Sequence, residues 1–112
     1  MLSEEDYVQL AQKELAALIN ALDTLEHDDL EAELENDIIT IDFGAGPPYV
    51  INSHRAARQI WMAAEHTAWH FDFDPAKSSW IAHKNGDELW STLTRTLQQR
   101  LGTTAPISLS RP

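Results

Sequence analysis

The stretch that decides the fold runs from residue 23 to residue 43 and reads DTLEHDDLEAELENDIITIDF. Apolar and acidic residues alternate from residue 29 to residue 35, which is the period of a half-buried strand. Asn36-Asp37 is a two-residue turn signal, and the alternation resumes in residues 39–43. The sequence therefore predicts a hairpin whose first strand carries a row of carboxylates on its outer face.

This stretch also concentrates negative charge. Residues 23–37 contain His27, no lysine or arginine, and eight carboxylates, which are Asp23, Glu26, Asp28, Asp29, Glu31, Glu33, Glu35 and Asp37. Like charges at this density repel one another, and folding raises that repulsion unless salt or a cationic partner relieves it. Composition alone favours a merely solvated acidic face, and a binding surface for cations is the alternative.

A helix is expected before the acidic stretch. Ser3 is the predicted N-cap. Apolar residues then recur on one helical face at Val8, Ala11, Leu15, Leu18, Leu22 and Leu25. Asp23 and Glu26 come near the negative end of this helix, where each carboxylate costs a few tenths to about 1 kcal/mol. Such a conflict with local preference is typical of functional sites.

After the hairpin, the pattern predicts four more strands and a second helix. The strands are expected at residues 49–52, 59–63, 69–73 and 79–83. The helix is expected from about Asp87 to Leu101, with Asp87 and Glu88 in its first turn and Gly102 as its stop. The predicted fold class is α+β: a two-layer sandwich with the N- and C-terminal helices packed on one face of an antiparallel sheet of about six strands.

Length and composition limit the domain organisation. The 112 residues, 43% of them apolar, predict a single domain at residues 1–102 and a tail at residues 103–112. Ile107 and Leu109 of that tail can lie in an apolar groove. The absence of cysteine excludes disulfides, thiolate metal sites and cysteine nucleophiles. The N-terminus has neither signal-peptide nor transit-peptide character, and no apolar run is long enough to span a membrane, so a cytoplasmic location is expected.

The charge distribution limits the kinds of partner that can be expected. The net charge is −10, and residues 1–46 alone carry thirteen acidic residues against Lys13. Phosphate backbones require a basic surface, so nucleic acid is excluded as an expected partner, and cations or a basic protein fit better.

Enzyme activity is not expected. The chain contains no nucleophile elbow, no zincin motif and no phosphate-binding glycine loop. Paired carboxylates can hydrolyse glycosides, but these lie on a convex strand and helix end rather than in a cleft. Carboxylates with His27 suit Ca, Mg, Mn or Fe. Because EF-hand spacing is absent, we expect weak, poorly selective binding of several ions.

The open face of the predicted sheet should display Asn52, Gln59, Trp61 and His70. A tryptophan on a solvated face is an informative exception. Two interpretations have equal weight: a protein-docking patch centred on Trp61, or a Trp61 covered by a loop or by the tail.

Four segments together resemble a known family. They are YVIN at 49–52, QIWMA at 59–63, WHFD at 69–72 and GDELW at 86–90. The chain is similar through them to the frataxin family in its bacterial CyaY branch, over about residues 4–101. The resemblance implies the α-β6-α fold of that family and an iron-binding protein of iron-sulfur cluster assembly. Iron, ferrous or ferric, would be weakly bound, and other divalent cations could compete.

The resemblance also implies the site residues and partners. The family's acidic ridge, which binds iron and meets a basic surface of the cysteine desulfurase, maps onto Asp23, Glu26, Asp28, Asp29, Glu31 and Glu33. The family's sheet surface, which binds the partner, maps onto Asn52, Gln59, Trp61 and His70. The implied partners are the cysteine desulfurase and the iron-sulfur scaffold protein. The expected assembly state is a monomer, with iron-dependent oligomers as a second expectation.

The chain departs from the family at two places. His54 and Ala56 stand where the family commonly has glutamine and proline, so a looser turn is expected there. Ile19, Asn20 and Thr24 occupy helix positions that are often acidic, so the strand half of the ridge should be the stronger half. The alternative function, from another class, is a small acidic chaperone or inhibitor that binds a protein through its open sheet face.

Overall fold

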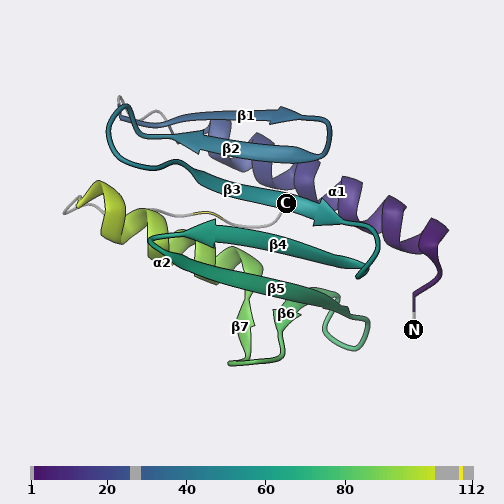
Figure 1. Cartoon of the computed structure of the whole chain (residues 1–112). Helices are drawn as coiled ribbons and strands as arrows, with labels where there is room; N and C mark the ends of the chain where they lie inside the picture. The colour runs from purple at the N-terminus through teal and green to yellow at the C-terminus, as the bar shows by residue number, and fades with distance from the viewer. Residues whose placement is uncertain (1, 26–28, 103–108, 110–112) are drawn as a thin grey trace.

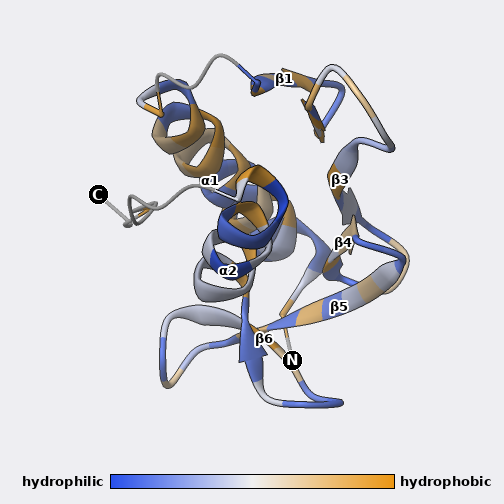
Figure 2. Ribbon diagram, turned by 90° about the vertical axis from the view of Figure 1, so that its left-hand side faces the viewer, coloured by the Kyte–Doolittle hydropathy of each residue, from blue (hydrophilic) through white to orange (hydrophobic). Residues whose placement is uncertain are grey.

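The computed structural model describes residues 2–25, 29–102 and 109. It has two layers (Figures 1 and 2): the helices α1 (Glu4–Asp23) and α2 (Leu89–Leu101) lie on one side, and a single antiparallel sheet lies on the other. The residues that both helices bury, such as Leu15 of α1 and Leu93 of α2, belong to the core between the layers. The predicted α+β sandwich is confirmed.

The sheet has seven strands rather than about six, and each strand pairs with the next in chain order. They are β1 (Glu31–Glu35), β2 (Ile38–Asp42), β3 (Tyr49–His54), β4 (Gln59–Ala64), β5 (Thr67–Asp74), β6 (Ser79–Ala82) and β7 (Asp87–Glu88). All six expected strands exist, so the error in the count comes from β7 alone.

The prediction that Asp87 and Glu88 lie in the first turn of the second helix is wrong. Gly86, with φ of 77°, turns the chain so that Ile81 pairs with Glu88 and Ala82 pairs with Asp87. The helix begins only at Leu89, and Glu88 caps it by accepting hydrogen bonds from the backbone N–H groups of Trp90 and Ser91. Acidic residues are favourable both at the N-cap of a helix and in its first turn. Helical spacing alone therefore could not show whether Asp87 and Glu88 precede the helix or begin it.

The first helix begins after its predicted N-cap and ends at Asp23. Ser3 is the N-cap, and its Oγ accepts a hydrogen bond from the Asp6 N–H at 3.1 Å. The buried face of the helix differs from the predicted face at one position, because Tyr7 is buried whereas Val8 is only half-buried. The Tyr7 hydroxyl crosses to the sheet and donates to the Gln59 carbonyl oxygen at 2.7 Å.

The predicted hairpin is confirmed. Asn36 and Asp37 have φ of 53° and 62°, the left-handed values that a type I′ turn requires. Glu35 therefore pairs with Ile38, and the register continues to Glu31 opposite Asp42. Register fixes which side chains share a face of the sheet, so this turn places the whole acidic strand.

One core lies between the layers. Its largest fully buried side chains include Trp80, Tyr49 and Phe71. Gly102, with φ of 59°, ends α2 as predicted. Leu109 of the tail is half-buried and packs against the core, whereas Ile107 lies outside the described residues. No helix in the described ranges combines the length and the apolar character needed to cross a membrane.

Candidate functional site

Four residues of the predicted ridge lie in described parts of the chain, and all four are exposed. Asp23 ends α1, Asp29 precedes β1, and Glu31 and Glu33 belong to β1. Glu26 and Asp28, together with His27, lie outside the described residues. Below, "the ridge" means Asp23, Asp29, Glu31 and Glu33.

The conflict between Asp23 and the helix dipole is present in the structure. Asp23 is the last residue of α1, and the last turn of this helix contains no basic residue. Carbonyl oxygens without an intrahelical partner give this end partial negative charge, so the carboxylate is repelled by its own helix. A bound cation would relieve this repulsion.

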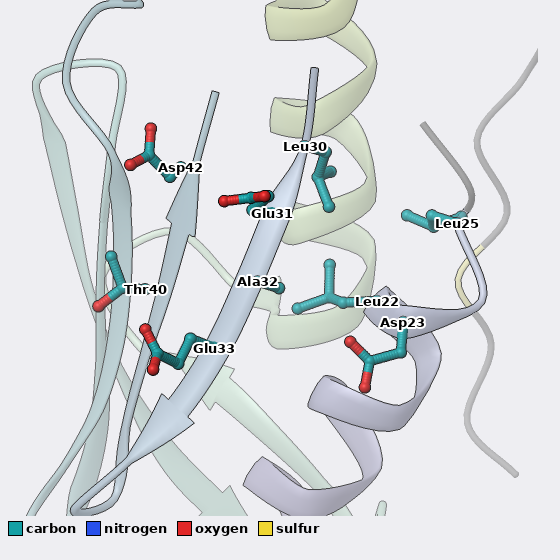
Figure 3. Close-up of a pocket in the computed structure, with 9 residues that line it drawn as sticks. All are labelled: Leu22, Asp23, Leu25, Leu30, Glu31, Ala32, Glu33, Thr40 and Asp42. Atoms are coloured by element: carbon teal, nitrogen blue, oxygen red, sulfur yellow. The ribbon is translucent and has the colours of Figure 1, made fainter. Parts of the chain in front are cut away.

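Three residues of the ridge, Asp23, Glu31 and Glu33, line a groove with a volume of about 560 Å³ at the edge of the sheet. Figure 3 shows that it receives side chains from both sides of β1. Asp23 lies on the helix side with Leu22 and Ala32, whereas Glu31 and Glu33 lie on the other side of the strand. The ridge is therefore two-sided, with the backbone of β1 between its carboxylates.

Asp42, which the sequence analysis did not select, belongs beside the ridge. It lies directly opposite Glu31 in the β1–β2 pairing, and both side chains are exposed. Like charges directly opposite each other destabilise a pair of strands. The turn signal at Asn36-Asp37 contained the information to find this pair, because a two-residue turn fixes every cross-strand partner in a hairpin.

The described carboxylates form an array rather than a cage. Within residues 2–25, 29–102 and 109, no three histidine, aspartate or glutamate side chains converge closely enough to hold one metal ion. Oxygen ligands still suit hard cations and iron. The arrangement can hold a cation by two carboxylates, such as Glu31 and Asp42, with water completing the coordination.

The predicted partner-binding residues come together on the open face of the sheet. Asn52 pairs with Trp61 and Trp61 pairs with His70, so the three form one row across β3, β4 and β5. Gln59 lies two residues from Trp61 on the same face, and its Oε1 accepts a hydrogen bond from Trp61 Nε1 at 2.8 Å. All four residues thus occupy one surface.

Trp61 is half-buried because two histidines stack on it. The His54 ring lies 3.8 Å from the Trp61 ring and the His70 ring lies 4.1 Å from it, and both are nearly parallel to it. Two side chains of the same face therefore cover part of the tryptophan ring. In the sequence, His54 stood out only as a departure from the family, and its place two residues after Asn52 was the signal that could have found it.

His54 also takes part in the turn after β3. Its Nδ1 accepts a hydrogen bond from the Ala57 N–H at 3.3 Å, and the Arg58 N–H donates to the Arg55 carbonyl oxygen at 3.1 Å. The predicted looseness of this turn stays a prediction, but the position has specific contacts of its own.

The ridge and the sheet surface are continuous. Glu35 of β1 pairs with Ile38, and Ile38 pairs with Asn52, which begins the row that reaches His70. Ile38 is 42% exposed, an unusual value for a large apolar side chain within a sheet. A partner that contacts Trp61 can therefore also contact the acidic strand.

A second group of charges lies at another corner, where α2 meets two loops. The Arg100 Nη1 lies 2.8 Å from Glu65 Oε2, and its Nη2 donates to the carbonyl oxygens of Ala45 and Pro47. The Tyr49 hydroxyl lies 2.6 Å from the same Glu65 oxygen. Below, "the paired corner" means Tyr49, Glu65 and Arg100.

These contacts shift two pKa values in opposite directions. The hydrogen bond from Tyr49, followed by that from Arg100, lowers the pKa of the Glu65 carboxyl from its ordinary value. Burial, followed by the hydrogen bond to Glu65, raises the pKa of the Tyr49 phenol. Both shifts favour a protonated phenol facing an ionised carboxylate at neutral pH.

The fold and site define a class: an α+β sandwich with an acidic edge strand beside an aromatic sheet surface. Residues 1–103 match the Frataxin-like domain. The chain is 33% identical over 85 residues to the iron-sulfur cluster assembly protein CyaY of Azotobacter vinelandii, a match that covers 74% of this chain and 77% of the relative. The chain therefore belongs to the frataxin family, in its bacterial CyaY branch.

Solved structures show the same fold. Frataxin from Psychromonas ingrahamii superposes with a TM-score of 0.82 at 19% identity, covering 96% of this chain and 99% of that protein. Trimeric frataxin from the yeast Saccharomyces cerevisiae, complexed with ferrous iron, superposes with a TM-score of 0.73 at 27% identity, covering 84% of this chain and 87% of that one.

Proposed function

We propose that this protein binds iron and acts in iron-sulfur cluster assembly, without catalysis of its own. Two comparisons support the proposal: the curated relatives are named for iron-sulfur cluster assembly, and a yeast frataxin has been solved with ferrous iron. Within the structure, the observation that carries it is the like-charge pair of Glu31 and Asp42, next to a helix that ends in Asp23.

The proposed iron site is the ridge with Asp42. Each of these carboxylates is exposed, so an arriving ion keeps part of its water shell and can leave again quickly. Bound iron neutralises repulsion that the fold otherwise retains, which gives binding a favourable electrostatic term. Such loose binding suits an iron donor, and equally a regulator whose ridge changes charge with iron supply.

The proposed partners are the cysteine desulfurase and the iron-sulfur scaffold protein. The partner surface would be formed by Asn52, Gln59, Trp61 and His70, because these residues lie on the same face of the sheet as the carboxylates of β1. A basic partner would be steered by the ridge and then held by contacts around the stacked Trp61. Iron on the ridge would weaken this steering, which is how iron could regulate the complex.

A ferrous iron titration followed by NMR tests the iron site. We expect the first changes at Asp23, Asp29, Glu31 and Glu33, and we expect the double variant Glu31→Gln/Asp42→Asn to bind iron several times more weakly. Glu5→Gln removes one exposed carboxylate from the first turn of α1 and is the matched control. Changes confined to His54, His70 and His83 would show that carboxylates do not hold the iron.

The exposed Ile38 beside Trp61 supports a second candidate, a small acidic chaperone or inhibitor that binds a protein through the open sheet face. Copurification separates the two functions. Recovery of the cysteine desulfurase supports the first, whereas recovery of an exported effector supports the second.

A further inference from the structure

The outer edge of β1 is a place where another strand can be added. In the described part of the chain, β1 is the first strand of the sheet and pairs only with β2. In an antiparallel pair, the N–H and C=O groups of alternate residues point away from the partner strand. Figure 1 shows β1 at the border of the sheet. The edge thus offers backbone donors and acceptors to an incoming chain.

The groove beside this edge offers complementary surfaces on its two sides. Its helix side is formed mainly by the apolar residues Leu22, Leu25, Leu30 and Ala32, with Asp23 at the end of α1 as a carboxylate on this side. Its other side carries Glu31 and Glu33, and Figure 3 shows these carboxylates across β1 from the leucines. Leu34, further along the strand, is 36% exposed. One side thus accepts apolar side chains and the other accepts cations.

We infer that an extended segment of a partner protein, with basic and apolar residues in alternation, binds here as an additional strand. Successive side chains of a strand point to opposite faces of the sheet. In such a segment, the basic side chains would lie beside Glu31, Glu33 and Glu35, and the apolar side chains would enter the groove next to Leu22 and Ala32. Backbone hydrogen bonds to β1 would supply the remaining affinity.

The charges of β1 favour such a segment over a second copy of this chain. If two copies paired along β1, the exposed carboxylates Glu31, Glu33 and Glu35 would face an identical acidic row. Like charges in cross-strand positions destabilise the pairing. The inference rests on the proposed function only in taking the partner of the ridge to be basic, and it requires no iron.

The test uses the full chain and the peptide acetyl-Lys-Val-Lys-Val-Lys-amide, which matches the five residues of β1. Two modified peptides carry N-methyl groups either on both valines or on the three lysines, so each blocks one edge of the peptide. Strand addition uses only one edge. We therefore expect one modified peptide to bind about tenfold more weakly than the parent, and the other to bind nearly as well.

Amide hydrogen exchange locates the bound peptide. The outward-pointing amides of β1 should exchange more slowly when the parent peptide is bound, because they then donate to its carbonyl oxygens. Glu33→Gln should weaken binding about twofold to fivefold, whereas Glu5→Gln, on the first turn of α1, should leave it unchanged.

Three results would overturn strand addition: equal binding of both N-methylated peptides, no slowing of exchange in β1, or no binding of the parent peptide. The ferrous iron titration on the same sample keeps this outcome separate from the proposed function. If iron still perturbs the ridge while the peptides fail, only the mode of partner binding is refuted.

Discussion

The ridge and the paired corner use carboxylates in opposite ways. At the paired corner, Glu65 receives hydrogen bonds from Tyr49 and Arg100, and the Arg100 guanidinium also lies 4.3 Å above the Phe43 ring. At the ridge, Glu31 faces another carboxylate across the strand pair. The first arrangement stabilises the native state, and the second destabilises it.

The two regions differ in whether their charges are already paired within the fold. The paired corner joins α2 to the loop between β2 and β3, so its charges are committed to the fold. Asp23 lies at a helix C-terminus and Glu31 lies opposite Asp42, so neither carboxylate has a counterpart of the Glu65–Arg100 ion pair among the described residues. Negative composition alone does not distinguish these two uses.

The largest predicted effect breaks the paired corner at Gly46. Both Gly44→Ala and Gly46→Ala place an alanine at a positive φ, 81° and 77° respectively, which costs about 1 kcal/mol. Only at Gly46 would the new Cβ come within 2.7 Å of Arg100 Nη2. We therefore expect the loss in unfolding free energy, measured with urea, to be roughly twice as large for Gly46→Ala as for Gly44→Ala. Equal losses would mean that Arg100 moves aside without consequence.

A smaller effect appears in the pH dependence of stability. The folded pKa of Glu65 lies below its ordinary value of 4.5, so its stabilising contribution is complete above pH 4.5 and is lost as the pH falls through the folded pKa. The difference in unfolding free energy between wild type and Glu65→Gln should therefore shrink on acidification.

Tyr49→Phe sharpens the same test, because the Tyr49 hydroxyl is the largest cause of the shift. In this variant, an NMR titration of the Glu65 carboxyl should show its pKa rising back toward 4.5. An unchanged titration would assign the shift to Arg100 instead.

The smallest effect concerns the ridge and has the opposite sign. Glu31→Gln removes the repulsion with Asp42 and should stabilise the fold by about 0.3–0.5 kcal/mol at low salt. The control Glu5→Gln removes a carboxylate that suits its helix end, so it should destabilise by a few tenths of a kcal/mol.

Moderate salt or millimolar divalent cation should raise the melting temperature of the wild type, and salt should raise that of Glu31→Gln less. A melting temperature that salt leaves unchanged would mean that the ridge charges lie too far apart to interact.

Local patterns were sufficient for most of the fold. Alternation and turn residues predicted the hairpin and six strands, and Ser3 and Gly102 predicted helix ends. The seventh strand was missed because Asp87 and Glu88 suit a helix start, and only their pairing with β6 shows that they are extended. Tyr7 was missed on the buried face because its partner is the Gln59 carbonyl oxygen, which is distant in sequence.

The candidate site, too, could be predicted only in part from local sequence patterns. Sequence selected the acidic strand and the row from Asn52 to His70, and the structure brings that row together. It did not select Asp42 or His54, since the role of each depends on a neighbour in another strand. The roles of these residues in binding iron and a partner stay predictions.

The sequence by itself determined the layers of this protein, its hairpin register and the sign of its surface, because periodicity, turn geometry and charge are local properties. Tertiary structure decided which carboxylates are paired and which are not. Glu65 and Glu31 are equally acidic residues in the chain, but Arg100 lies beside the first and Asp42 beside the second. Only folding brings such distant neighbours together, so only the structure shows that Glu31 of β1 faces another carboxylate whereas Glu65 faces a guanidinium.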